Sequence, residues 1–179
     1  MIQVNMKYTK QNYRRFMWFD FFKRGTRKIC NITFIAIIFS IGVLSLIGAI
    51  NRENYTPSVF SIIMMLICLL YPLLVFGIIE LFVLRAQKVT PSLFELDMAF
   101  TFHDDHFVST STGELSTGTA EVKYTALYRV FETKDCFYLY QQMSSSFIIE
   151  KSNFTSGTPE ELSEILSKAL PKKKFVKYT

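Results

Sequence analysis

Two long apolar stretches decide the fold of this chain: ICNITFIAIIFSIGVLSLIGAI (residues 29–50) and TPSVFSIIMMLICLLYPLLVFGII (residues 56–79). The first runs for 22 residues and the second for 24 without a charged side chain. An α-helix needs about 20 predominantly apolar residues to cross the hydrocarbon core of a bilayer. The stretches therefore predict two transmembrane helices, at 29–50 and 56–84, and they exclude an ordinary soluble enzyme.

The charge of the chain is unevenly distributed around these stretches. The 179 residues carry a formal net charge of +5. Residues 1–28 hold eight Lys or Arg against one acidic residue, whereas residues 93–170 hold five against twelve. Four lysines make residues 172–179 a basic tail. Because the basic residues flank the apolar stretches or end the chain, and the remaining domain is acidic, nucleic acid is not an expected partner.

The basic residues also predict the orientation of the helices. The eight of residues 1–28 precede the first stretch, and Arg85 and Lys88 follow the second. The connecting loop, residues 51–55, is short and its two charges cancel. Since Lys and Arg are retained on the cytoplasmic side, we expect a multi-pass protein of the cell (inner) membrane with both termini in the cytoplasm and an extracytoplasmic loop.

Polar and small residues within the two stretches leave two questions open. Glu80 is the one ionisable residue of the second span. A charge there is either functional or, as its position near the cytosolic end favours, satisfied by water or a basic partner. The small residues of the first span either pack inside the hairpin or make a homodimer contact. They are Ala36, Ser40, Gly42, Ser45 and Ala49.

The segment before the first span combines two patterns. Residues 1–10 alternate apolar and polar side chains, which predicts a strand that joins the cytosolic sheet. Residues 11–28 mix aromatic and basic side chains, which is typical of an interfacial amphipathic helix. Alternatively, these aromatic side chains cover one end of the cytosolic domain. The residues expected at the lipid interface are Arg14, Arg15, Trp18, Phe19 and Phe22, together with Lys172, Lys173 and Lys174 of the basic tail.

After a linker at residues 85–92, the pattern of residues 93–171 changes from helix to sheet. Alternation from Leu93 to Phe102 predicts a strand, and shorter apolar runs separated by turn residues predict five more before residue 150. A Thr158-Pro159-Glu160-Glu161 start predicts a final helix with a capping box. About seven short strands and one helix indicate an α+β membrane protein with an antiparallel pleckstrin-homology-like β-barrel that the C-terminal helix caps.

The order of these parts resembles the YcxB-like family of bacterial membrane proteins. The segments that carry the resemblance are YTKQNYRRF (8–16), FTFHDDHFVSTSTGE (100–114), YTALYRVFETKDCFYLY (124–140), FIIEKSNF (147–154) and TPEELSEIL (158–166). The resemblance implies a membrane-anchored domain of pleckstrin-homology-like fold. It brings no catalytic residues, substrate or cofactor with it.

No pattern in the chain predicts an enzyme or a cofactor. His103 and His106 flank two aspartates in a turn, but no third metal ligand accompanies them, so we expect no metal site. The serines at 144–146 lack a strand–turn–helix setting for a nucleophile and indicate a loop. The three cysteines form no C-x-x-C pair.

Three functional hypotheses follow. The first is a non-enzymatic scaffold that recruits a protein partner at the cytosolic membrane face through Asp104, Asp105 and Asp135. The second is a sensor of anionic lipid that uses the aromatic belt and the basic tail. The third is an auxiliary or immunity-type subunit of a membrane transporter that docks through the hairpin, and homo-oligomerisation is compatible with each.

Overall fold

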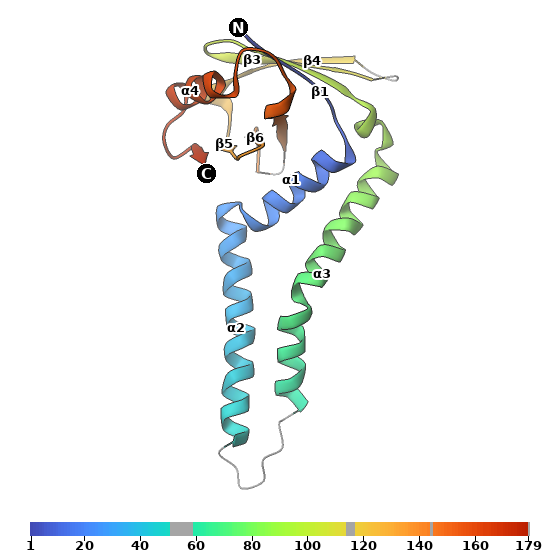
Figure 1. Ribbon diagram of the computed structural model, residues 1–179, viewed down its shortest axis with the longest axis vertical. Coiled ribbons are helices and arrows are strands. Elements are labelled where there is room, and N and C mark those ends of the chain that lie inside the picture. Colours follow the sequence, from blue (N-terminus) through green and yellow to red (C-terminus); the bar gives the residue numbers. More distant parts are fainter. Residues whose placement is uncertain (51–58, 114–116, 144, 179) are drawn as a thin grey trace. The chain divides into compact units, whose positions relative to one another are not determined.

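A computed structural model describes residues 1–50, 59–113, 117–143 and 145–178 (Figure 1). The chain divides into two compact units, which are described separately below. One contains Met1–Tyr13 and Ala86–Thr179, and the other contains Arg14–Arg85. The first unit holds the strands and the C-terminal helix, whereas the second holds the long apolar helices.

The larger sheet of the first unit has five strands in the order β4-β3-β2-β1-β8. All of its pairings are antiparallel, and β1 pairs with β2 across the intervening residues 8–96, with Ile2 opposite Phe102 and Lys7 opposite Asp97. The predicted N-terminal strand is therefore confirmed. The strand bounds are β1 (Ile2–Lys7), β2 (Asp97–Phe102), β3 (His106–Thr112), β4 (Thr117–Lys123) and β8 (Phe154–Ser156).

The smaller sheet has four strands in the order β7-β6-β5-β9. Its last pairing, between β5 and β9, is parallel, with Val130 opposite Phe175. The strand bounds are β5 (Arg129–Glu132), β6 (Cys136–Tyr140), β7 (Ser146–Glu150) and β9 (Phe175–Lys177). Short 3₁₀ turns connect the elements at η1 (Pro91–Glu95), η2 (Tyr124–Ala126) and η3 (Lys151–Asn153).

The hydrophobic core lies between the two sheets and under helix α4 (Pro159–Ala169). Strand β1 has a strict buried–exposed alternation, so that Ile2, Val4 and Met6 face the core. Helix α4 begins with the predicted capping box: Thr158 Oγ1 accepts from the Glu161 backbone N–H, and the Glu161 carboxylate accepts from the Thr158 N–H. Leu162 and Leu166 of α4 and Leu170 just after it complete the core, as their spacing predicts.

The structure corrects three details of this domain. The two sheets do not close into the expected barrel. The expected strand at 93–102 starts later, because Pro91 opens the turn η1 and the strand begins at Asp97. Residues 172–179 are not a simple tail, because Phe175–Lys177 form β9 and raise the strand count above seven.

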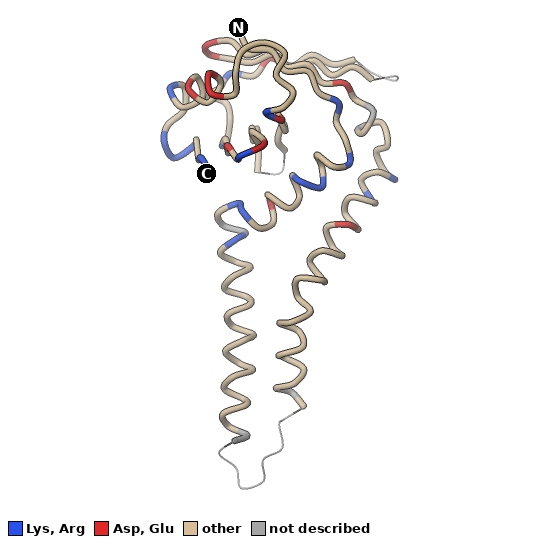
Figure 2. Tube along the Cα trace, viewed as in Figure 1, with Lys and Arg blue, Asp and Glu red and all other residues tan. Residues whose placement is uncertain are grey.

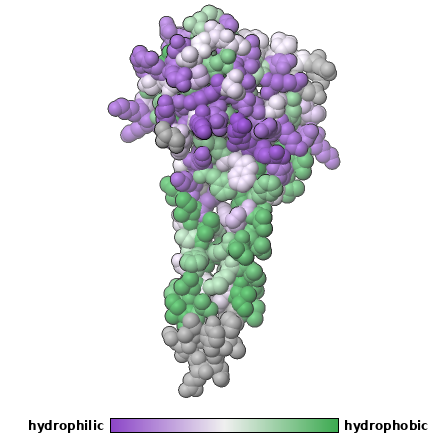
Figure 3. Space-filling view, viewed as in Figure 1, coloured by the Kyte–Doolittle hydropathy of each residue, from purple (hydrophilic) through white to green (hydrophobic). Residues whose placement is uncertain are grey.

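The second unit is dominated by α2 (Gly25–Ile50) and α3 (Val59–Val89). Both helices are long and apolar enough to cross a membrane, judged by length and composition. Their surface is predominantly hydrophobic (Figure 3), and Leu69 and Leu73 are 73% and 68% exposed. No Lys, Arg, Asp or Glu interrupts α2 after its first turn (Figure 2). The predicted loop at 51–55 and the start of the second predicted span lie outside the described residues.

The bounds of these helices differ from the expected ones. The predicted interfacial helix at 11–28 is α1 (Lys10–Phe22), after which Gly25 already begins α2. Helix α3 continues to Val89, beyond the predicted end at residue 84 and into the predicted linker.

Small residues of α2 pack against α3. The position of a Cβ on Gly42 lies 3.5 Å from Met64 Cβ, and Ser45 Oγ is 2.8 Å from Ser61 Oγ. Tyr71 donates a 3.2 Å hydrogen bond to Asn31 Oδ1. Gly42 and Ser45 therefore serve packing inside the hairpin, which was one of the two interpretations of the small-residue pattern.

Candidate interaction surface

Strand β4 is an open edge of the larger sheet. It pairs with β3 over its whole length, from Thr117 opposite Thr112 to Lys123 opposite His106. It is the last strand in the sheet order, and no other strand of the described residues pairs with it. Of its seven residues only Val122 is buried. The outer backbone N–H and C=O groups of β4 are therefore available to another extended chain.

The first half of β4 lacks the features that usually prevent edge-to-edge pairing. The four residues of this half are exposed on both faces of the sheet, and none is charged. They are Thr117, Gly118, Thr119 and Ala120. Natural edge strands are commonly protected by charged side chains, proline or a bulge. Thr117–Ala120 has none of these, and its pairing with β3 shows no register shift. This half of the strand can accept a partner strand without burying a charge.

The second half of β4 adjoins an acidic turn. The turn between β2 and β3 contains Asp104 and Asp105, and His106 lies opposite Lys123 of β4. His106 Nδ1 is 2.6 Å from Asp105 Oδ1, and its Nε2 is 3.9 Å from Glu121 Oε1. The hydrogen bond with His106 lowers the pKa of Asp105, so this carboxylate stays ionised at neutral pH.

The backbone below the turn is firmly held. Buried Tyr124 donates a 2.7 Å hydrogen bond to the carbonyl oxygen of His103. Burial raises the pKa of Tyr124, and the charges of Asp104 and Asp105 raise it further. The turn is thus a rigid, negatively charged end of the open strand. We call residues 103–106 and 117–123 together the β4 edge surface.

The predicted partner-binding aspartates are not all in one place. Asp104 and Asp105 belong to the β4 edge surface, whereas Asp135 lies in the β5–β6 turn of the other sheet. There its backbone carbonyl accepts a 2.9 Å hydrogen bond from the Lys151 N–H. The histidines of the first turn stack on each other, with ring centroids 4.6 Å apart. Among the described residues no group of three or more His, Cys, Asp or Glu side chains is arranged to hold a metal.

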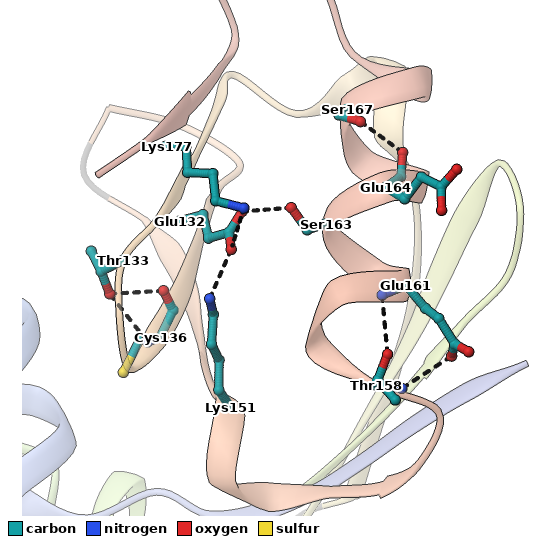
Figure 4. Close-up of polar contacts among 10 residues, drawn as sticks. All are labelled: Glu132, Thr133, Cys136, Lys151, Thr158, Glu161, Ser163, Glu164, Ser167 and Lys177. Atoms are coloured by element: carbon teal, nitrogen blue, oxygen red, sulfur yellow. Dashed lines mark hydrogen bonds and ion pairs between the residues drawn. The ribbon is translucent and has the colours of Figure 1, made fainter. Parts of the chain in front are cut away.

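A buried carboxylate lies at the centre of a second polar cluster (Figure 4). Glu132 of β5 is 3% exposed. Its Oε1 lies 2.7 Å from Lys151 Nζ and 3.3 Å from Lys177 Nζ, and its Oε2 accepts a 2.6 Å hydrogen bond from Ser163 Oγ. Burial acts to raise the pKa of Glu132, but these hydrogen bonds hold it below its usual value. The cluster fastens η3, α4 and β9 to β5.

Sequence reasoning missed this cluster because its members are far apart in the chain. Glu132 is 31 residues from Ser163 and 19 from Lys151. One signal was present: Glu132 shares the alternating face of Val130, which is a core residue. An acidic side chain at a core-facing position requires a partner.

Comparisons with known proteins add one finding. The model of the YcxB-like protein family matches residues 102–166. This YcxB-like segment runs from the last residue of β2 into α4, so it contains the β4 edge surface and Glu132 with two of its three partners. The match supports the resemblance over these residues. No curated protein and no solved structure matches the chain.

Outside the YcxB-like segment, several residues expected at the lipid interface have protein partners. Arg14 forms an ion pair with Glu80, and its Nη2 donates a 2.9 Å hydrogen bond to Glu80 Oε2. Glu80 is therefore satisfied by a basic residue, Arg14, as its structural interpretation expects. Phe19 is buried, and Trp18 stacks on Phe22 with ring centroids 4.9 Å apart.

The lysines of the predicted basic tail are also divided. Lys174 Nζ donates a 2.8 Å hydrogen bond to the Leu127 carbonyl, and Lys177 contacts Glu132. Lys172 and Lys173 are exposed. The contacts of Lys174 and Lys177 hold the end of the chain against β5, which leaves a smaller cationic surface than the sequence suggests.

Proposed function

We propose that this protein is a membrane-anchored, non-enzymatic interaction module. In this proposal α2 and α3 span the membrane with both termini in the cytoplasm, and they hold a pleckstrin-homology-like domain at the cytosolic face. The domain recruits a protein partner by adding an extended segment of that partner to strand β4. The excess of Lys and Arg in residues 1–28, together with Arg85 and Lys88 near the end of α3, supports this orientation.

The observation that carries the proposal is the open, uncharged edge of Thr117–Ala120. Strand addition supplies affinity through main-chain hydrogen bonds, and side-chain pockets or charges supply specificity. The uncharged edge comprises the first four residues of β4, before Glu121 and Lys123. The neighbouring Asp105 and Glu121 favour a segment with a basic residue beside its uncharged part. The proposed occupant is therefore a protein segment of β-forming residues flanked by Lys or Arg.

Lipid sensing has weaker support from the geometry. Arg14, Lys174 and Lys177 have contacts within the protein, and Phe19 is buried. The hypothesis of an auxiliary transporter subunit that docks through the small residues of α2 also has weaker support, because Gly42 and Ser45 face α3.

The test is to place charge on the open edge. Lysine on an edge strand blocks pairing with another chain. We expect the double variant Thr117→Lys/Thr119→Lys of the full-length protein to lose the proteins that co-purify with the wild type after crosslinking in native membranes. The matched control is Ser152→Lys/Ser167→Lys, which adds the same charge at exposed positions away from β4. Equal recovery of every partner by both variants would refute the proposal.

A further inference from the structure

One end of the smaller sheet brings together three segments that are far apart in the chain. Strand β5 begins at this end and β6 finishes there, and β9 begins beside the start of β5 because these two strands are parallel. The Tyr128 N–H donates a 2.8 Å hydrogen bond to the Tyr140 carbonyl, and the Val130 N–H donates a 2.7 Å hydrogen bond to the Lys174 carbonyl. The start of β5, the turn that follows β6 and the turn that precedes β9 therefore lie side by side.

The charged side chains of these three segments are all basic. They are Arg129 at the start of β5, and Lys172, Lys173 and Lys174 before β9. Residues 124–129, 141–146 and 170–175 contain no Asp or Glu. Figure 2 shows Lys and Arg without Asp or Glu on the turn between α4 and the C-terminus. This end of the sheet is therefore positive, although residues 93–170 as a whole carry more acidic than basic residues.

Two large hydrophobic side chains are exposed beside these cations. Met143, in the turn after β6, is 66% exposed, and Tyr128 is 40% exposed. In the described residues from 97 to 178, no other large hydrophobic side chain is as exposed as these two. The Arg129 guanidinium lies over the Tyr128 ring, 5.8 Å from its centroid. A tyrosine with an apolar ring, a polar tip and a cation beside it suits the interface between a bilayer and water.

The lysines are presented on a closed turn and not on a loose tail. The Lys174 N–H donates a 2.7 Å hydrogen bond to the Pro171 carbonyl, and Lys174 Nζ donates to the Leu127 carbonyl at 2.8 Å. Lys172 and Lys173, between these fixed points, are exposed. Because the turn is already ordered, a partner that binds the two lysines does not have to order the backbone that carries them.

We propose that this end of the domain docks on the anionic lipid headgroups of the bilayer that anchors the protein. We call it the basic end surface, and its residues are Tyr128, Arg129, Met143, Lys172, Lys173 and Lys174. Cations attract anionic headgroups, and the exposed Tyr and Met side chains suit the region just below them. A weak attraction is sufficient, because the anchor keeps the domain at a high local concentration beside the bilayer.

The inference rests on the anchorage by α2 and α3 proposed above and not on strand addition. It adds an orientation to that anchorage. The turn η2 joins the basic end surface to the acidic turn of the β4 edge surface: Lys174 Nζ lies 3.4 Å from the Thr125 carbonyl oxygen, and the Tyr124 N–H donates a 3.0 Å hydrogen bond to the Asp105 carbonyl. Docking of one surface therefore fixes the position of the other relative to the bilayer.

The test measures how close Met143 comes to the headgroups. Full-length protein with ¹³C-labelled methionine methyl groups is placed in nanodiscs of phosphatidylcholine, with or without phosphatidylglycerol, that contain a lipid with a gadolinium chelate on its headgroup. We expect the Met143 line to broaden in the anionic nanodiscs and much less in the neutral ones. Equal broadening in both, or none in either, would overturn the proposal. Met64 and Met65 of α3 report anchorage and should broaden in both kinds of nanodisc. If they do, a failure at Met143 refutes the basic end surface and leaves the proposed function intact.

Two variants assign the effect to this surface. Each cation near an anionic bilayer contributes about five-fold to the equilibrium, so Lys172→Gln/Lys173→Gln should lower the ratio of docked to undocked protein about 20-fold. Lys134→Glu is the matched control: it changes the net charge by the same amount at an exposed position in the turn at the opposite end of β5 and β6, and it should leave the broadening unchanged. An equal loss in both variants would refute the assignment. A response of Met143 to polyglutamate and not to anionic lipid would give the surface to an acidic protein and would also overturn the proposal.

Discussion

The Glu132 cluster gives the sharpest test of how the domain is held together. Glu132→Gln keeps the size of the side chain and one acceptor oxygen but removes the charge. In the wild type the carboxylate receives a 2.7 Å contact from Lys151 and a 2.6 Å hydrogen bond from Ser163. A hydrogen bond to a charged group contributes about 1.5–3 kcal/mol, and breaking a buried ion pair costs about 3–5 kcal/mol.

The actual loss should be smaller than the sum of these terms. The side chain of Lys177 is 55% exposed and that of Lys151 is 21% exposed, so both can regain water after the substitution. Glutamine also retains one hydrogen bond. We therefore expect Glu132→Gln to lower the free energy of opening of β5, β9 and α4 by about 2 kcal/mol. Since 1.4 kcal/mol is tenfold in an equilibrium constant, this is ~30-fold faster amide exchange.

Hydrogen exchange with mass spectrometry on the full-length protein in detergent measures this change. The informative amides include Val130, which donates to Lys174, and Tyr178, which donates to the Glu132 carbonyl. Glu164→Gln is the matched control, because Glu164 pairs with Lys168 on the exposed face of α4 and both side chains are well exposed. Exchange less than about three-fold faster in Glu132→Gln, or equally faster in Glu164→Gln, would refute the account of the cluster.

Three further predictions follow from other contacts. Because the folded-state pKa of Glu132 lies below its ordinary value of 4.5, its contribution is complete above pH 4.5 and is lost as the pH falls through the folded pKa. The difference in opening free energy between wild type and Glu132→Gln should therefore shrink below about pH 4.5, and a constant difference down to acid unfolding would contradict this. Thr158→Ala removes the N-cap of α4 and should cost about 1 kcal/mol of helix stability. The first-turn amides of α4 should therefore exchange about five-fold faster, and unchanged exchange would show that the cap is not needed. Gly42→Leu places a large side chain whose Cβ lies 3.5 Å from Met64 Cβ, so it should push α2 and α3 apart. A disulfide between cysteines introduced at positions 45 and 61 should then form more slowly than in a Gly48→Leu control, where a Cβ meets nothing within 4 Å. Equal rates would refute packing at Gly42.

Local patterns predicted those parts of the fold that depend on neighbouring residues. The capping box at Thr158 and Glu161 was visible because both residues lie within one helical turn. The apolar stretches predicted α2 and α3, since length and composition alone define such helices. The alternation of Ile2, Val4 and Met6 predicted β1 with its buried face.

Contacts between distant residues were not predictable in this way. The parallel pairing of β9 with β5 joins segments more than 40 residues apart, and nothing in Phe175–Lys177 alone distinguishes a strand from a tail. The same holds for Arg14 and Glu80, which are 66 residues apart. Of the candidate site, the sequence predicted the acidic turn at Asp104 and Asp105. The open edge of β4 emerged only from the order of the strands in the sheet.

Site-specific photocrosslinking tests the proposed strand addition most directly. Benzoylphenylalanine is introduced at Thr119 of the full-length protein in native membranes, and at Ser167 on the exposed face of α4 as a control. The account predicts that Thr119 crosslinks to an extended segment of one protein and that Thr117→Lys abolishes this crosslink. Probes placed in turn at Thr117, Thr119 and Glu121 should capture alternate residues of that segment, because residues two apart lie on the same face of a strand. A crosslink of Thr119 to a second copy of this chain would replace the partner by self-association. No crosslink at Thr119 above the level at Ser167 would contradict the proposed function.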